Sequence, residues 1–195
     1  MGANVYLDSV TSVGYDSESA ATIITADIQG KQGKRIAIRA AAFSCGGTAT
    51  TVYFMQALGS GTTSADAASG ASQIVLTAEI GNSGNSVAAN DILVVVQDNG
   101  TYLFSKCRSV ATLTMDLCTV LTGAAAAGAT VYDLGIQSDE GHLQYRLATS
   151  SQTARALDGG FLYADAKGYP MRVHHANDAA AAGSIDYVTV DYINR

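Results

Sequence analysis

Between residues 90 and 121 the chain reads NDILVVVQDNGTYLFSKCRSVATLTMDLCTVL, three apolar runs separated by two short polar turns. The runs are rich in Val, Leu, Thr and aromatic residues, which favour strands, and each is too short for an independent helix. Residues 98–100, Asp-Asn-Gly, are a strong hairpin signal, because Asn and Gly accept the positive φ of tight β-turns. The segment therefore predicts consecutive antiparallel strands.

The residue pattern within this segment also predicts how its strands are buried. Residues 92–96, ILVVV, are apolar throughout, which is typical of a strand deep in a core. In residues 113–121, LTMDLCTVL, apolar and polar side chains alternate, which is typical of a strand with one buried face. Leu117 is expected to point inward. A small-residue connection at 122–130 then leads to a further strand at 131–136.

Similar patterns recur along the rest of the chain. Further strands, bounded by Gly, Asp, Asn or Ser, are expected at 21–29, 34–43, 50–58, 73–80, 143–150, 159–166, 170–176 and 184–195. One face of the strand at 34–43 is expected to carry Ile36, Ile38, Ala40 and Ala42. The alanine runs at 124–127 and 179–182 are shorter than an independent helix needs, so we expect loops or single turns there.

Ten to twelve short strands without a βαβ pattern predict an all-β fold, with a β-sandwich or jelly-roll-like body and a smaller β-meander or barrel lobe. The meander has its own hydrophobic pattern, so we expect residues 1–72 plus 133–195 to form the body and residues 73–132 the lobe. A chain of 195 residues buries about 70% of its unfolded surface on folding, so its stability requires neither disulfides nor metals.

Composition limits the partners. Charged residues make up 14% of the chain and the net charge is −6, which gives no basic footprint for nucleic acid. Much of the surface must therefore consist of Ala, Gly, Ser and Thr, small side chains that suit permanent packing against a neighbour. The same composition also fits a plain soluble domain with an alanine-rich bias. The three cysteines, Cys45, Cys107 and Cys118, lack metal-ligand spacing and are expected to be reduced thiols.

The start of the chain, MGANVYLDSV, has neither the basic nor the apolar region of a secretory signal. No apolar run reaches the roughly 18 residues of a membrane span. We therefore expect a protein that is made in a cytoplasm, is soluble there and has no membrane partner.

Two places contain residues that bind metals or transfer protons in other proteins. His174 and His175 are adjacent, but neighbouring strand residues point to opposite faces, so we do not expect them to share an ion. Asp139, Glu140 and His142 lie close together in SDEGH, and a loop with solvated acids is the plainer interpretation. The carboxylate pairs available to a glycan-active enzyme are Asp139/Glu140 and Asp158/Asp165. Nothing in their spacing favours such an enzyme.

Nucleophile and phosphate motifs are incomplete. Ser44 and Cys45, in FSCGG, lack the G-x-S-x-G elbow of a hydrolase nucleophile. Residues 59–66, GSGTTSAD, lack the lysine of a phosphate-binding loop. We therefore expect no catalytic, cofactor-binding or metal-binding residues, and we expect that the protein is not an enzyme.

Two sets of residues suit an interaction surface. Residues 30–35, GKQGKR, contain the basic cluster Lys31, Lys34 and Arg35, which fits either docking to an acidic partner or a solvated hairpin turn beside a sheet edge. Several tyrosines near predicted loops or strand ends suit either sugar stacking or a protein interface. They are Tyr6, Tyr15, Tyr169 and Tyr187.

Residues 89–132 resemble a module common in tailed-bacteriophage virion proteins. In that module an Ala-Gly-Asp turn leads into an apolar strand, then Asp-Gly-Thr and an aromatic strand, an alternating Thr/Leu strand, and finally Ala-Ala-Ala-Gly and Val-Tyr. This chain departs from it at Asn90, where glycine is more usual before the Asp, and Asn also tolerates positive φ. Residues 168–195, with NDAAAAG before a last long strand, resemble the end of phage head-associated structural proteins.

These two segments, 89–132 and 168–195, are most similar to capsid decoration, or cement, proteins, and the resemblance covers only part of the chain. This resemblance implies a virion structural protein on the capsid surface, assembled in the host cytoplasm, with the major capsid protein as its partner and no cofactor. A homo-oligomer, a dimer or trimer, is expected. The alternative is a tail- or fibre-associated adhesin that binds a host glycan, and a glycan-active β-sandwich enzyme is the third hypothesis.

Overall fold

A computed structural model describes residues 10–13, 16–82, 85–136, 142–148, 152–156, 162–163 and 166–194. These residues form strands and no helix, so the predicted all-β fold is confirmed. None of them forms a helix that is long and apolar enough to cross a membrane. The strands are β1 (Val10–Val13), β2 (Asp16–Ile28), β3 (Arg35–Cys45), β4 (Thr50–Gln56), β5 (Gly59–Thr62), β6 (Gln73–Val75), β7 (Gly81–Asn82), β8 (Asn85–Ser86), β9 (Ile92–Val96), β10 (Tyr102–Ala111), β11 (Thr114–Leu117), β12 (Thr130–Asp133), β13 (Leu143–Leu147), β14 (Gln152–Ala156), β15 (Leu162–Tyr163) and β16 (Met171–Ile193). The expected ten to twelve strands are too few, because pieces as short as β7 and β8 carry no recognisable alternation.

The chain divides into two compact units, which we name the body (residues 1–56 with 142–195) and the inserted unit (residues 57–141). The inserted unit lies in the chain between β4 and β13, which pair with each other as neighbours in the body. It is larger than the lobe expected at 73–132. The reason is that β5 pairs with β12, which brings residues before 73 into the inserted unit.

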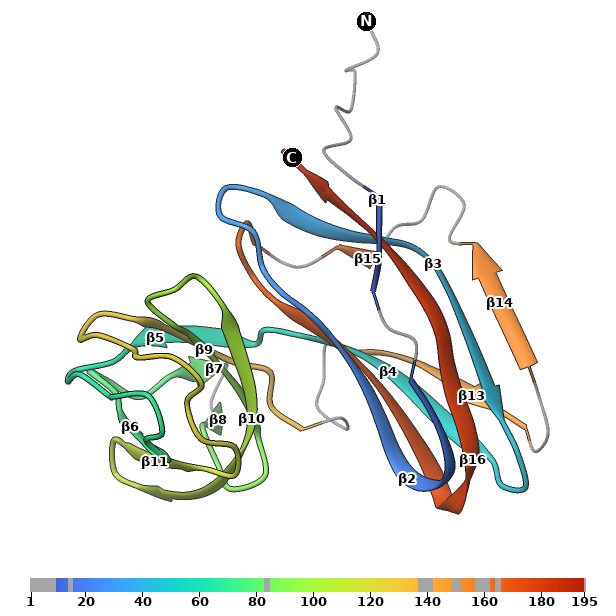
Figure 1. Cartoon of the computed structure of the whole chain (residues 1–195), viewed down its shortest axis with the longest axis horizontal. Coiled ribbons are helices and arrows are strands. Elements are labelled where there is room, and N and C mark those ends of the chain that lie inside the picture. The colour runs from blue at the N-terminus through green and yellow to red at the C-terminus, as the bar shows by residue number, and fades with distance from the viewer. Residues whose placement is uncertain are drawn as a thin grey trace, which may run out of the picture. The chain divides into compact units, whose positions relative to one another are not determined.

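The body is an eight-stranded antiparallel sheet that folds over on itself. Its longest strand, β16, pairs with β4 through residues 171–177 and with β3 through residues 183–193. β2 stays beside β16 on both sides of the bend. Figure 1 shows both strands turning back at the lower end of the body, so that the two halves of the sheet face each other across one core. The body is therefore a β-sandwich.

The alanine run at 179–182 lies at this bend. The expectation of a loop or single turn there is wrong, because the run is part of β16, which continues where two separate strands were expected. The register between β16 and β2 shifts on both sides of Ala181. The Asn177 side-chain amide donates to the Ala181 carbonyl at 3.1 Å, and the Asp178 N–H donates to the Ala49 carbonyl at 3.0 Å. These bonds fix the bend of the strand.

The face of β3 that lies in the core changes at Arg39. Ile38 belongs to the core before this residue and Ala41 belongs to it afterwards. The register between β3 and β16 shifts at the same place, so Arg39 is the extra residue of a β-bulge. The expectation that Ala40 and Ala42 share the face of Ile38 is therefore wrong.

The inserted unit is a six-stranded antiparallel sheet in the order β5-β12-β9-β10-β11-β6. Backbone hydrogen bonds connect its two end strands, β5 and β6, at their last residues. The Ser64 N–H donates to the Val75 carbonyl, and the Thr77 N–H donates to the Thr62 carbonyl, both at 2.8 Å. Because these bonds connect the first strand of the sheet with the last, the sheet closes into a small barrel.

The strands predicted on either side of the turn at 98–100 and the turn after the second of them are confirmed. The strand expected at 113–121 is shorter than predicted, because β11 ends at Leu117 and residues 118–121 belong to a loop. β9 is buried over its first four residues and lies between β10 and β12. The turn at 98–100 joins β9 to β10, with Gly100 at a φ of 79°. Asn90 has a φ of 84°, the left-handed conformation that its position before Asp91 requires. Leu117 is fully buried in the core of the barrel.

Candidate binding surface

Two loops of the inserted unit, residues 63–72 and 118–128, lie side by side and form what we name the loop surface. Ala67 and Ala125 pair as a β-bridge, with N–H···O distances of 2.8 and 2.9 Å in the two directions. Both alanines, together with Leu121, are buried in the core of the barrel. The two loops are therefore anchored to each other and to the core beneath them.

Polar side chains fix the second of these loops further. Asp66 accepts a hydrogen bond from the Ala127 N–H at 2.8 Å, and Asp98 accepts one from the Ala126 N–H at 2.9 Å. The Thr63 hydroxyl donates to the Ala126 carbonyl at 2.7 Å. Each of these bonds holds the backbone rather than another side chain, so the loop has a defined shape without regular secondary structure.

The side chains exposed on the loop surface are mostly small and uncharged. They include Ala65, Ala68, Ser69, Ala124 and Ala127. Val120, at 48% exposure, is the largest apolar side chain among them. Since small side chains lose little rotamer freedom when they are covered, a fixed surface of this kind can be buried against a partner at low entropic cost.

Charge is divided unequally between the two units. Of the 17 acidic and 11 basic residues of the chain, eight acidic and two basic ones fall within residues 57–141. The inserted unit therefore carries the whole net charge of −6, while the body has nine residues of each sign. A unit with this charge repels phosphate groups.

The two adjacent histidines lie on opposite faces of β16. The ring Nε2 of His175 lies 2.8 Å from the Ser44 carbonyl across the sandwich, whereas His174 packs edge-on against Tyr53 with ring centroids 6.3 Å apart. Burial, aided by the positive charges of the nearby Arg172 and His175, lowers the pKa of His174 to about 4. Burial also lowers the pKa of His175. Among the described residues no group of three metal-binding side chains is found, these histidines included.

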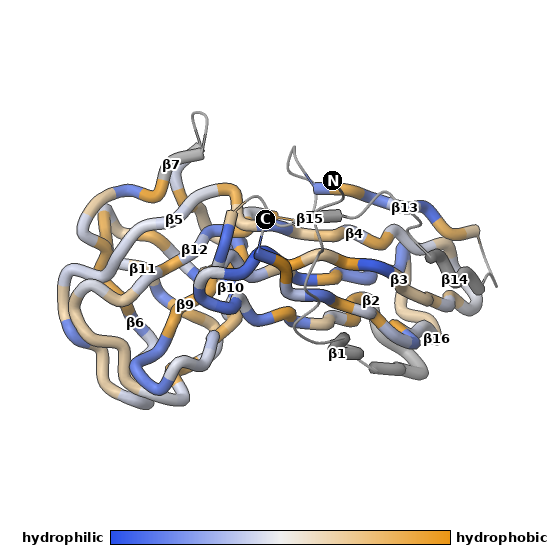
Figure 2. Tube along the Cα trace, turned by 90° about the horizontal axis from the view of Figure 1, so that it is seen from above, coloured by the Kyte–Doolittle hydropathy of each residue, from blue (hydrophilic) through white to orange (hydrophobic). Residues whose placement is uncertain are grey.

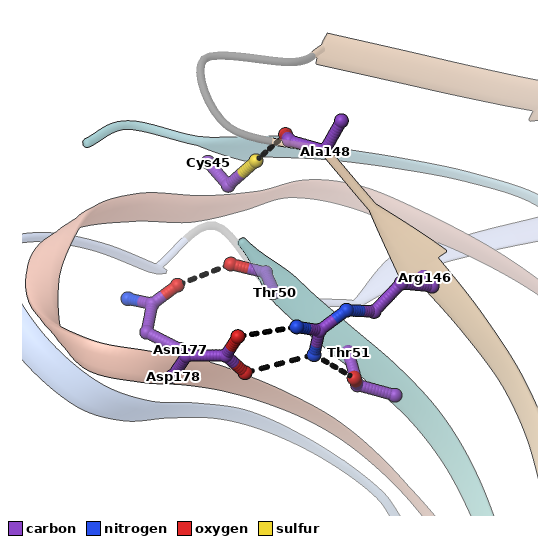
Figure 3. A network of polar contacts seen from close by, with 7 residues as sticks. All are labelled: Cys45, Thr50, Thr51, Arg146, Ala148, Asn177 and Asp178. Atoms are coloured by element: carbon purple, nitrogen blue, oxygen red, sulfur yellow. Dashed lines mark hydrogen bonds and ion pairs between the residues drawn. The ribbon is translucent and has the colours of Figure 1, made fainter. Parts of the chain in front are cut away.

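Ser44 and Cys45 both make contacts between strands. The Ser44 hydroxyl lies 2.5 Å from the Ser184 hydroxyl on β16. The buried Cys45 thiol donates to the Ala148 carbonyl at 2.8 Å (Figure 3). These contacts give both residues a structural role in joining β3 to its surroundings.

All three cysteines are free thiols, as predicted. Cys45 and Cys107 are buried, and Cys118 is exposed on the loop surface. Burial, aided by the negative charge of Asp91, raises the pKa of Cys107 to about 11. A thiol with this pKa is protonated at neutral pH and is a poor nucleophile.

The basic cluster at 30–35 forms the turn between β2 and β3. The Lys34 N–H donates to the Lys31 carbonyl at 2.9 Å, and the Lys31 ammonium lies 5.6 Å from the centre of the Tyr192 ring. Gly33 has a φ of 73°, which a tight turn requires at this point. The turn interpretation of this cluster is therefore confirmed.

The remaining candidates are divided between described and undescribed parts of the chain. His142 precedes β13, and its Nδ1 accepts a hydrogen bond from the Gln56 N–H at 3.3 Å. Tyr169 packs against the core of the body, and Tyr187 on β16 is 36% exposed. Outside the described residues lie Tyr6, Tyr15, Asp139, Glu140, Asp158 and Asp165.

Sequence reasoning located the small-residue connection at 122–130, but it missed that this loop begins at residue 118, and it did not predict the pairing of the two loops. Small residues also fill positions 59–72, of which 59–62 form β5, and nothing local indicates that segments so far apart in the chain lie together. Compared with models of protein families, with curated proteins and with solved structures, the chain gives no match.

Proposed function

We propose that the chain is a structural protein of tailed-bacteriophage virions, which binds the assembled capsid and stabilises it by bridging neighbouring major capsid subunits. The observation that carries this proposal is the segment 89–132, whose order of turns and strands is similar to a module of such virion proteins. In this chain the segment supplies β9, β10, β11 and β12 of the inserted barrel. This chain has Asn90 where glycine is more usual in the module, and the positive φ of Asn90 is a conformation that glycine also adopts readily.

The loop surface is the part of the inserted unit that we propose docks onto the capsid. Its backbone is fixed and its exposed side chains are small, so contact with the shell orders little that is not already ordered. A protein that binds only the assembled lattice stabilises the assembled state by mass action. Copies that bridge several subunits gain avidity without a high affinity at any single contact.

Counting the copies in purified virus particles by quantitative mass spectrometry tests this function. A capsid-stabilising protein is present in proportion to the major capsid protein, and particles stripped of it disassemble at a lower temperature. A handful of copies located at the tail overturns the proposal and favours the glycan-binding adhesin instead.

A pair of matched variants tests the docking face. Ala124 and Ala78 are both exposed in the inserted unit, and only Ala124 belongs to the loop surface. Ala124→Asp buries a carboxylate in the contact and is expected to reduce co-sedimentation with capsids by ~10-fold or more, since an unpaired buried charge costs well over 1.4 kcal/mol. Ala78→Asp, the same change outside the surface, is expected to bind as the parent does. Equal binding by both variants would show that the capsid contact lies elsewhere.

A further inference from the structure

β13 is the end strand of its half of the body sheet. It pairs with β4 on one side, and within the described residues no strand pairs with its other side. Figure 2 shows β13 beside β4 at the border of the body. An end strand presents a row of N–H and C=O groups to which another strand can add. The chemistry of this edge therefore determines what can join it.

The direction of the backbone groups follows from β4. The Gln56 N–H donates to His142 Nδ1, so Gln56 turns its N–H toward the β13 side. Because this direction alternates along a strand, Phe54 faces the same side, where it pairs with Leu143. Leu143 and, two residues on, Tyr145 therefore use their N–H and C=O groups on β4.

The β13 residues that alternate with Leu143 and Tyr145 direct their backbone groups away from β4. Gln144 and Arg146 direct their N–H and C=O groups toward the outer edge of β13, and both side chains are exposed. Leu143, at the start of the strand, is apolar and 38% exposed. The edge therefore combines unpaired backbone groups with an apolar side chain that the rest of the body covers incompletely.

We propose that β13 pairs antiparallel with β13 of a second copy of the chain, around a two-fold axis through Tyr145. In this register Gln144 of one copy exchanges both N–H···O bonds with Arg146 of the other copy. The two-fold axis repeats the same exchange between Arg146 of the first copy and Gln144 of the second. Leu143 then lies opposite Leu147 of the second copy, on the core side of the sheet. The five residues of β13 pair along their full length, and one sheet continues across both copies.

The positive charge on this edge does not oppose the pairing. A charged side chain on an end strand usually blocks the addition of another strand. Figure 3 shows Arg146 held by Asp178 of β16 and Thr51 of β4. The Arg146 Nη1 donates to Asp178 at 2.8 Å and to Thr51 at 2.7 Å. The guanidinium is thus drawn over the face of its own sheet and neutralised by a carboxylate.

This dimer is a property of the body and does not depend on capsid binding, so purified protein suffices to test it. Gln144→Pro removes the outward N–H, and proline is tolerated on the free side of an end strand. Gln144→Ala removes the same side chain but keeps the N–H. In sedimentation velocity at micromolar concentration, the parent and Gln144→Ala are expected to be dimers and Gln144→Pro a monomer. A monomeric parent, or a dimeric Gln144→Pro with an unchanged melting temperature, overturns the proposal.

Disulfide cross-linking tests the register without proline. Cα atoms of a hydrogen-bonded antiparallel pair lie about 5.5 Å apart, within the range that a disulfide spans. In a Cys118→Ser background, a mixture of Gln144→Cys and Arg146→Cys chains is expected to cross-link at least ~10-fold faster than either chain alone, because only unlike cysteines face each other. Absence of a disulfide in the mixture, or equal cross-linking by Gln144→Cys alone, overturns the two-fold axis at Tyr145.

Discussion

Leu117 is the position where one substitution should separate the stabilities of the two units. Its side chain is fully buried among the apolar residues that fill the barrel. Leu117→Asp removes this side chain, which by analogy with large-to-small core changes costs about 2–5 kcal/mol. It also places a carboxyl group where no water reaches, which costs several kcal/mol more even when the group is protonated.

The sum of these two costs of Leu117→Asp is comparable with the whole free energy of unfolding of the inserted unit. A unit of about 85 residues has a free energy of unfolding of about 4–13 kcal/mol, at 0.05–0.15 kcal/mol per residue. We therefore expect the barrel to unfold in Leu117→Asp while the sandwich, which has a separate apolar core, remains folded.

Hydrogen exchange followed by mass spectrometry resolves the two units in one experiment. Peptides from β9 and β10 are expected to lose their protection in Leu117→Asp, and peptides from β3 and β4 to keep it. Cys118→Asp is the matched control, because Cys118 is the next residue and is exposed. Wild-type protection of β9 in Leu117→Asp would refute the assignment of this side chain to the core.

Three further changes test individual features. The pKa of His174 is lowered to about 4 in the folded body, so the unfolded chain binds more protons between about pH 6.5 and pH 4 and stability falls as the pH falls through that range. Urea unfolding should show a loss of about 3 kcal/mol from this residue, which His174→Gln removes. Gly183→Ala places a Cβ 2.6 Å from the ring of the buried His175 and should lower the melting temperature, whereas Gly47→Ala meets open space and should not. Asn90→Val should cost about 1–2 kcal/mol in urea unfolding, because a β-branched residue disfavours positive φ, whereas Asn90→Gly should cost nothing. Stability that does not change between pH 6.5 and pH 4 would contradict the His174 argument. An unchanged melting temperature of Gly183→Ala, or an unchanged free energy of unfolding of Asn90→Val, would contradict the other two.

The parts of the fold that depend on neighbours in the sequence were predictable. The turn at 98–100 and the positive φ of Asn90 follow from side-chain chemistry within a few residues. The burial of β9 follows from its unbroken apolar run, and the burial of Leu117 follows from alternation along a single strand. The candidate histidines, too, lie on opposite faces because strand geometry alone requires it.

The parts that depend on distant segments were not predictable. The alanines at 179–182 have no alternation, so only their pairing with β2 distinguishes a bent strand from a loop. The bulge at Arg39 is visible only in its register with β16, and without it the later residues of β3 were placed on the wrong face. The loop surface likewise arises from the pairing of Ala67 with Ala125, which no local pattern encodes.

The way the barrel is spliced into the sandwich has a consequence for how such a chain can change. In chain order the barrel begins with β5 and ends with β12, and these strands pair with Gly59 opposite Asp133. The body strands that precede and follow the barrel are β4 and β13, which pair with Phe54 opposite Leu143. The polypeptide thus departs and returns at adjoining points, and a short hairpin in place of the barrel would leave every sandwich strand in register. The barrel is therefore an insertion that can be exchanged. Its loops can diverge or be replaced while the sequence of the sandwich stays the same.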